Sequence, residues 1–167
     1  GVMEAALRTV YAVVTGKKMK DLNIKPVRGL DGVKEATLEV GKLGKVKVAV
    51  AHSMANARKI LDMIRAGTAD YVFIEFMTCP GGCIAGGGEP IPTTNEIRVL
   101  RSRALYSDDA KVQKKRQSHE NASIQKAYRT FLGEPNGKLS HKLLHTRYTK
   151  RGSQLPHTDV KLGGTEE

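Results

Sequence analysis

The hydrophobic residues of the first forty positions fall into two patterns. Residues 2–15 carry valines, Leu7 and Tyr11 at mixed helical spacing, which predicts a largely buried helix that ends at Gly16. Residues 33–40 alternate more loosely between apolar and polar side chains, as an edge strand does. The chain is therefore expected to begin with a helix and an edge strand, joined by an extended segment that then turns.

A strand, a helix and a second strand follow in close succession. Valines stand at every second position of residues 46–50, which is typical of a strand. Residues 53–66 have a helical pattern, with Ser53 as the expected N-cap and Gly67 as the stop. Residues 71–78 are an almost continuous apolar run, which predicts an inner strand covered on both faces. This order predicts a βαβ unit whose two strands pair in parallel through a right-handed crossover.

Beyond residue 92 the pattern changes to short helices with many charges. Thr94 is the expected N-cap of a first helix, residues 118–135 have a second helical pattern, and residues 141–148 have a third. Their apolar faces are too narrow to form a core alone, so we expect this part to wrap around something else.

These patterns predict an α/β protein with three parts. Residues 1–92 form a βαβ parallel-sheet lobe that is incomplete by itself, residues 93–151 form a small helical segment, and residues 152–167 form a disordered tail. The chain opens on Gly1, directly in a helical pattern and without an initiating methionine. We therefore expect it to be a segment of a longer polypeptide.

Composition adds limits on the kind of partner. The 167 residues are 40% hydrophobic and contain no tryptophan, which predicts an aliphatic core. Residues 98–167 hold 15 basic and 7 acidic side chains, which is +8 of the total net charge of +11. Because aromatic residues are not interleaved with these charges and no groove-reading motif is present, a solvated face or a docking surface for an acidic protein is favoured over nucleic acid. No apolar stretch is long enough for a membrane span, and no signal peptide is recognisable.

The candidate functional residues lie mainly in residues 71–90, YVFIEFMTCPGGCIAGGGEP. Cys79 and Cys83 follow the apolar run, which places both on a loop at the carboxyl edge of the sheet, where open α/β sheets bind ligands. Five glycines between Gly81 and Gly88 let the backbone come close to a bulky group. Soft thiolates on such a loop suit iron–sulfur chemistry better than a hard cation. A disulfide, a redox pair and buried thiols are open alternatives, because two cysteines alone are weak evidence.

Residues 75–90, EFMTCPGGCIAGGGEP, resemble the third signature motif of the iron-only (FeFe) hydrogenases. The resemblance covers the chain from Gly1 to about Arg151. Its other matching segments are GVMEAALR at 1–8, RALY at 103–106, SHEN at 118–121 and LLHTRY at 143–148. It implies reversible interconversion of molecular hydrogen with protons and electrons at an H-cluster. That cluster joins a 4Fe-4S cubane to a di-iron subcluster with CO, cyanide and dithiolate ligands.

The resemblance also assigns roles to residues of the loop. Cys79 corresponds to a cubane ligand, and Cys83 to the thiolate shared between the cubane and the di-iron unit. Met77 corresponds to the methionine that packs near the cluster, and with Cys83 it is the expected catalytic residue. The expected cofactor-binding residues are Cys79, Cys83, Gly82, Gly86, Gly87 and Gly88.

The chain also departs from the family's pattern. Two further signature motifs, which carry two cubane ligands and the proton-donating cysteine, are absent, and Glu89 stands where most members have glutamine. Histidine can replace a cysteine ligand, and the candidates are His52, His119, His141 and His145; His52 is more simply a packing or capping residue. Glu75 is expected to be structural rather than a proton relay.

Two functional hypotheses follow. The first is part of a catalytic hydrogenase, inactive without the missing N-terminal portion, which exchanges electrons with a ferredoxin or an NAD(P)-linked subunit. The second is a non-catalytic relative that serves iron–sulfur cluster assembly or partner binding. Cytoplasm is the expected compartment, with the periplasm as the alternative.

Overall fold

A computed structural model describes residues 1–149 and divides the chain into two compact units. The first, Gly1–Gln125, contains the sheet and every predicted site residue of the cysteine loop. The second begins at Lys126. The predicted disordered tail lies outside the described residues. Within them, no helix is both long enough and apolar enough to cross a bilayer.

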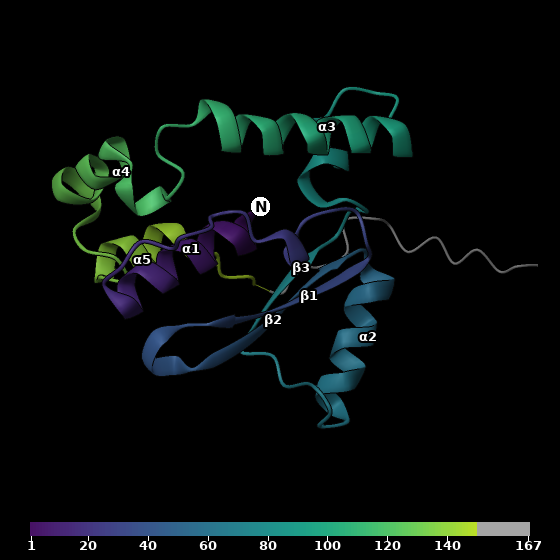
Figure 1. Ribbon diagram of the computed structural model, residues 1–167, viewed down its shortest axis with the longest axis horizontal. Helices are drawn as coiled ribbons and strands as arrows, with labels where there is room; N and C mark the ends of the chain where they lie inside the picture. The colour runs from purple at the N-terminus through teal and green to yellow at the C-terminus, as the bar shows by residue number, and fades with distance from the viewer. Residues whose placement is uncertain (150–167) are drawn as a thin grey trace, which may run out of the picture. The chain divides into compact units, whose positions relative to one another are not determined.

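The α/β fold class is confirmed, with helices on both faces of a small sheet (Figure 1). The helices and strands are α1 (Val2–Thr15), β1 (Val33–Glu39), β2 (Lys45–His52), α2 (Met54–Arg65), β3 (Phe73–Met77), α3 (Asn95–Ser107), α4 (Ala122–Ala127) and α5 (Lys138–Leu144). Short 3-10 turns lie at Lys25–Val27, Gly41–Leu43, Gly82–Ala85 and Ser118–Glu120, and π-helical turns at Asp108–Val112 and Tyr128–Leu132.

The predicted βαβ unit is confirmed, because β2 and β3 pair in parallel with Val48 opposite Phe73 and His52 opposite Met77. β1 is an edge strand, as predicted, and it pairs with β2 in the antiparallel direction. The tight turn at Gly41–Leu43 requires this direction, since only antiparallel neighbours can be joined by so short a connection. The sheet is therefore mixed rather than wholly parallel.

The prediction that residues 71–78 form an inner strand is wrong for this sheet. The strand order is β1-β2-β3, which leaves β3 at an edge. Phe73 and Phe76 remain 46% and 40% exposed. Within residues 1–149, no further strand pairs with β3.

The core has one layer on each face of β2, whose valines and alanines point alternately to the two sides. On one face, Val48 and Val50 pack with Met3 and Leu7 of α1. On the other face, Ala49 and Ala51 pack with Ile60 of α2. Nearly every residue of β2 is buried, so this central strand fixes the positions of both helices.

The helix at residues 2–15 is not largely buried, contrary to the sequence-based prediction. Val2 and Val13 are 65% and 75% exposed. Its buried stripe consists of Met3, Glu4, Leu7 and Arg8, at i, i+1, i+4 and i+5 spacing. Two of these four side chains are charged, and they pair with each other and with partners described below.

The ends of the helices agree with the sequence in three of four cases. Gly67 follows the end of α2 in the left-handed conformation, at φ 70°. Gly16 ends α1 in the left-handed conformation, at φ 65°. The hydroxyl of Thr94 accepts a hydrogen bond from the backbone N–H of Ile97 at 3.3 Å, as an N-cap does. Ser53, in contrast, makes no side-chain cap; its φ is 71° and its N–H donates to the carbonyl oxygen of Met77 at 2.8 Å.

The single helix predicted for residues 118–135 is also wrong. This segment is divided among a 3-10 turn, the six-residue α4 and a π-helical turn. Asn121 accounts for the first break, because its side chain accepts a hydrogen bond from the N–H of Ser123 at 2.9 Å and so starts a new helix.

Candidate functional site

The cysteine loop leaves the carboxyl end of β3 and turns back within a few residues. The N–H of Gly82 donates to the carbonyl oxygen of Cys79 at 2.9 Å, which closes the turn. Gly81 and Gly82 both have positive φ, at 86° and 73°, a conformation that other residues adopt only at a cost. Cys79 is half-buried, Cys83 is exposed, and both are free thiols. The disulfide alternative is therefore not realised in this structure.

One loop glycine, Gly82, has a neighbour too close for a side chain, and a second, Gly86, would only reach ordinary contact distance. A Cβ atom at Gly82 would lie 2.5 Å from the sulfur of Met77, and one at Gly86 would lie 3.4 Å from the sulfur of Cys79. Gly87 and Gly88 have nothing within 4 Å of such an atom. The predicted contribution of these last two glycines to binding a bulky group stays a prediction.

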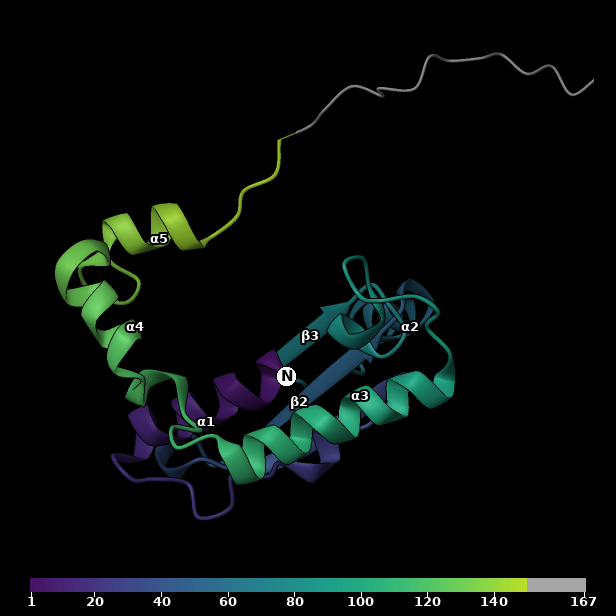
Figure 2. The ribbon, with the colours of Figure 1, turned by 90° about the horizontal axis from the view of Figure 1, so that it is seen from above.

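A cavity of about 500 Å³ opens beside the loop. Residues of α1, the strands, the cysteine loop and α3 line it. Figure 2 shows the backbone of these elements. The cavity lining includes Met3, Glu75, Met77, Cys83, Ile84 and Tyr106. Cys83 and Met77, the two predicted catalytic residues, thus lie together on one cavity, and Cys79 is not among the residues that line it.

Arg101 of α3 holds the loop in place, a role that sequence reasoning missed. Its guanidinium donates to the carbonyl oxygens of Ile84 at 2.8 Å and Pro90 at 2.6 Å. It also lies 3.5 Å from a carboxylate oxygen of Glu89, so the residue that departs from the family's glutamine has an ionic partner here. The available signal was an arginine one turn after Arg98, on the helix that follows the glycine loop directly.

His52 and Lys34 form a buried pair beneath the loop. His52 ends β2, and its Nε2 lies 3.0 Å from the Nζ of Lys34, which also donates to the carbonyl oxygen of Gly29 at 2.9 Å. Burial, and then the charge of Lys34, lower the pKa of His52 to about 4. Burial also lowers the pKa of Lys34, although Glu75 opposes this shift. Lys34 was missed as well, and its signal was an inward position at period two with the buried Ala36.

Glu75 has the structural role expected from the sequence. Its carboxylate accepts a hydrogen bond from the backbone N–H of Met3 at 3.1 Å. That N–H belongs to the first turn of α1, where helices lack internal acceptors and favour negative charge. Glu75 therefore joins β3 to the start of α1 at the cavity wall.

An ion-pair network occupies another side of the cavity. Arg8 pairs with Glu4 at 3.1 Å and with Asp109 at 2.9 Å. Asp109 also pairs with Arg28 at 3.1 Å and with Arg116 at 2.7 Å. Burial acts to raise the pKa of Asp109, but the hydrogen bonds from Arg8 and Arg116 outweigh it and hold that pKa well below its usual range.

The other candidate histidines are not among the residues that line the cysteine cavity. The Nδ1 of His119 lies 3.1 Å from the hydroxyl of Thr9, and His119 does not line the cavity. His141 and His145 belong to the second unit, where their ring centroids are 4.3 Å apart.

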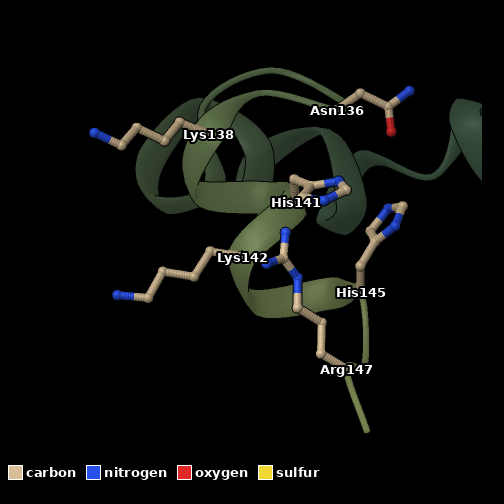
Figure 3. A pocket seen from close by; sticks show the side chains of 6 residues that line it. All are labelled: Asn136, Lys138, His141, Lys142, His145 and Arg147. Carbon is tan, nitrogen blue, oxygen red and sulfur yellow. The ribbon is translucent and has the colours of Figure 1, made fainter.

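These two histidines line a separate hollow of about 590 Å³. Figure 3 shows their rings on one side of α5 and the guanidinium of Arg147 turned back toward the helix. The remaining lining residues are Asn136, Lys138 and Lys142. The hollow is therefore basic, and its lining has neither a thiol nor a carboxylate.

The described residues provide two of the donors that an iron–sulfur cubane needs. Among residues 1–149, no group of three or more histidine, cysteine, aspartate or glutamate side chains is close enough to hold a metal ion. The two free thiols on a glycine loop nevertheless suit a cluster in their chemistry, because thiolate is the usual ligand of its irons. This site fits an iron–sulfur cluster as part of a larger ligand set.

Comparison with known families decides the relationship. Residues 1–87 match the family described as "Iron only hydrogenase large subunit, C-terminal domain", and residues 95–151 match "Iron hydrogenase small subunit". The chain belongs to the iron-only hydrogenase family. The resemblance inferred from the cysteine motif is thereby confirmed, together with the iron–sulfur, hydrogenase and oxidoreductase character that the family carries.

Individual relatives agree with this assignment. The chain is 46% identical over 152 residues to the NADP-reducing hydrogenase subunit HndD of Solidesulfovibrio fructosivorans, covering 90% of this chain and 26% of the relative. It is 55% identical over 108 residues to the periplasmic Fe hydrogenase large subunit of Nitratidesulfovibrio vulgaris, covering 64% of this chain and 25% of that one. This iron-only hydrogenase chain thus spans about a quarter of the length of these relatives.

A solved structure gives the same result for the fold. A variant of the FeFe-hydrogenase HydA1 from Chlamydomonas reinhardtii matches with a TM-score of 0.71 and 39% identity, over 89% of this chain and 44% of that one.

Non-hydrogenase relatives exist too. The cytosolic iron-sulfur assembly component 3 of Rattus norvegicus is 31% identical over 152 residues, covering 89% of this chain and 30% of the relative.

Proposed function

We propose that this chain forms the cysteine-loop part of an FeFe hydrogenase, and that the complete protein interconverts molecular hydrogen with protons and electrons. One observation carries the proposal: Cys83, a free thiol on a glycine loop at the carboxyl edge of β3, lines a cavity together with Met77. The similarity to hydrogenases over about nine-tenths of the chain supports it.

Within this function the two cysteines have different tasks. Cys79 is half-buried and does not line the cavity, so we infer that it holds the cubane. Cys83 is exposed and lines the cavity, so we infer that it is the thiolate shared with the di-iron unit, which supplies the iron sites for hydrogen chemistry when bound. Met77 contributes a polarizable thioether to the same wall and requires glycine at position 82.

The chain by itself is expected to be inactive. A cubane takes four protein donors, and the whole sequence contains two cysteines. Metal-site free energies on the order of 10 kcal/mol come from the complete ligand set acting together. The other ligands and the proton-donating cysteine would come from an N-terminal portion of the same protein.

The electron partner and the compartment are part of the proposal. We infer exchange with a ferredoxin or an NAD(P)-linked subunit; the relative HndD is called NADP-reducing. The cytoplasm is the first expectation and the periplasm the alternative, since one relative is called periplasmic. The basic surface of α5 suits an acidic partner by its charge.

A second candidate function is iron–sulfur cluster assembly without hydrogen chemistry. The similarity to the rat assembly component favours it, because that similarity covers 89% of this chain. The two functions differ in one observable. A hydrogenase carries bound CO and cyanide, whereas an assembly protein with a plain iron–sulfur cluster has no infrared bands from such ligands.

The test uses the complete hydrogenase that contains this chain. Cys83→Ser should abolish the infrared bands of CO and cyanide and nearly all hydrogen evolution, because a serine oxygen is a harder donor that bridges iron poorly. Cys79→Ser is the matched control on the same loop; it should affect the di-iron bands less and the cubane more. Full-intensity bands in the Cys83 variant would contradict the assignment. A wild-type protein with iron–sulfur absorbance but neither bands nor hydrogen output would favour the assembly function.

A further inference from the structure

Lys34 is a buried cation without an anionic partner. Its side chain extends from β1 into the cavity wall, and the residue is only 7% exposed. Its Nζ donates to the carbonyl oxygen of Gly29 and to the ring of His52, and within residues 1–149 it forms no ion pair with a carboxylate. Burying an unpaired charge is costly, so native proteins keep such groups where an opposite charge compensates them.

His52 adds a donor that also lacks a partner. Because its Nε2 accepts the hydrogen bond from the Lys34 ammonium, the ring proton of the neutral imidazole is on Nδ1. Nδ1 is buried and has no hydrogen-bond partner among the described residues. A buried N–H without an acceptor is rare in native structures and needs an explanation.

Both residues belong to the same cavity as Cys83 and Met77. The other side-chain cation of that lining, Arg8, is already paired with Glu4 and Asp109. An ammonium has three N–H donors, and the hydrogen bonds of Lys34 to Gly29 and His52 use two of them. The lining also includes the carboxylates of Glu4, Glu75 and Asp109, so the cavity as a whole is not positive. Near the cysteine loop, however, Lys34 carries a charge without an ion pair and His52 a donor without an acceptor among the described residues, and this local arrangement points to an anion.

We propose that Lys34 and His52 form a charge-compensating subsite for the anionic thiolate–sulfide cluster that Cys83 holds, and that they set its reduction potential. This inference rests on the proposed function. A cluster becomes more negative when it takes up an electron, so a fixed positive charge beside it stabilises the reduced state and raises the potential. Hydrogen bonds and charges around a metal site tune its potential in this way without being ligands.

The experiment compares variants of the complete hydrogenase in a redox titration of the 4Fe-4S cluster, followed by electron paramagnetic resonance, with iron content measured in parallel. Lys34→Met should shift the midpoint potential to more negative values, and Lys34→Arg, which keeps the charge, should stay near the wild type. Lys59→Met is the matched control, because it removes the same charge from an exposed position on α2. It should leave the potential unchanged.

The outcomes separate this inference from the proposed function. An unshifted potential in Lys34→Met, with wild-type iron content, would overturn the inference alone. If that variant fails to fold, Lys34→Gln keeps a donor while removing the charge, and the same comparison applies. A wild-type protein that binds no iron would overturn both. His52→Leu should also lower the potential, by less than Lys34→Met, because it removes a hydrogen-bond donor rather than a charge.

Discussion

Two polar regions face the same cavity, and they differ in how their charges are compensated. On one side, Glu4, Arg8, Arg28, Asp109 and Arg116 form a network in which every cation pairs with at least one carboxylate. On the other side, Lys34 has no carboxylate partner and the Nδ1 of His52 has no acceptor. The first region has both signs of charge in direct ion pairs. In the second, Lys34 forms no ion pair within residues 1–149, and the charges of Glu75 and Asp31 act on it only from farther away.

This difference in charge compensation distinguishes the region that supports the fold from the region that we propose as a binding site. The network joins α1, the 3-10 turn at Lys25–Val27 and the π-helical turn after α3, which are far apart in sequence. The ring of Tyr106 reinforces it, since the Arg28 guanidinium lies 4.5 Å from the ring centroid. A region whose charges are balanced within the chain can hold its shape alone. A region with unpaired donors beside two free thiols is suited to a group that comes from outside the chain.

The largest expected loss of stability comes from removing a carboxylate of the ion-pair network. Asp109→Asn removes the carboxylate that three arginines share. Breaking a buried pair leaves uncompensated charge, so we expect a loss of about 3 kcal/mol, the low end of the usual range because a quarter of the side chain is exposed. Urea unfolding measures it. The control is Asp62→Asn, whose exposed pair with Arg65 should contribute less than about 0.5 kcal/mol. Equal effects of the two changes would contradict the comparison.

The same network predicts how stability depends on pH. The pKa of Asp109 is lower in the folded protein than in the unfolded chain, so its contribution is present above the usual carboxyl pKa and is lost as the pH falls through the lowered value. Wild-type protein should therefore lose stability in acid more steeply than Asp109→Asn. Unfolding curves over a series of acidic buffers would show it. If the free energy of unfolding depended on pH in the same way in both proteins, Asp109 would not be the cause of the acid sensitivity.

A smaller loss of stability is expected from a substitution in the cysteine loop, because it changes backbone conformation and packing rather than charge. Gly82→Ala places a methyl group 2.5 Å from the sulfur of Met77 at a φ of 73°, so we expect a loss of about 2 kcal/mol from left-handed strain and displacement of Met77. Gly87→Ala is the control, since nothing lies within 4 Å of its added atom. Thermal unfolding should change in the first variant alone.

Sequence periodicity predicted the fold well where the spacing of neighbouring residues determines the element. The valines of residues 46–50 identified β2, and the order of elements identified its parallel pairing with β3. Periodicity failed where burial depends on distant partners. The exposed Val2 and Val13 of α1 look like core residues by type, whereas the buried Glu4 and Arg8 look like surface residues until Asp109 and Arg28 are known.

The site was predictable to the extent that it lies in one motif. Cys79, Cys83 and Met77 stand within a few residues of each other, and the structure brings Cys83 and Met77 to one cavity. Lys34 and Arg101 are distant in sequence and ordinary in type, so only the fold shows that Arg101 binds this loop and that Lys34 lines the same cavity. Long-range charge compensation leaves no local signal in a single sequence.

The smallest predicted effect concerns Ser53, between the two strand ends at the loop. Its φ of 71° and ψ of 152° lie in a region that glycine adopts far more readily than serine, and its side chain does not cap α2 as expected. The strain is maintained because its N–H donates to Met77 and His52 precedes it directly in β2. Ser53→Gly should relieve the strain and stabilise the protein by about 1 kcal/mol, measured by urea unfolding. Asn136→Gly is the control, since asparagine tolerates its φ of 60° and gains little from the exchange. A destabilised Ser53→Gly protein would show that the serine side chain, through its contact with Asn56, matters more than the backbone strain.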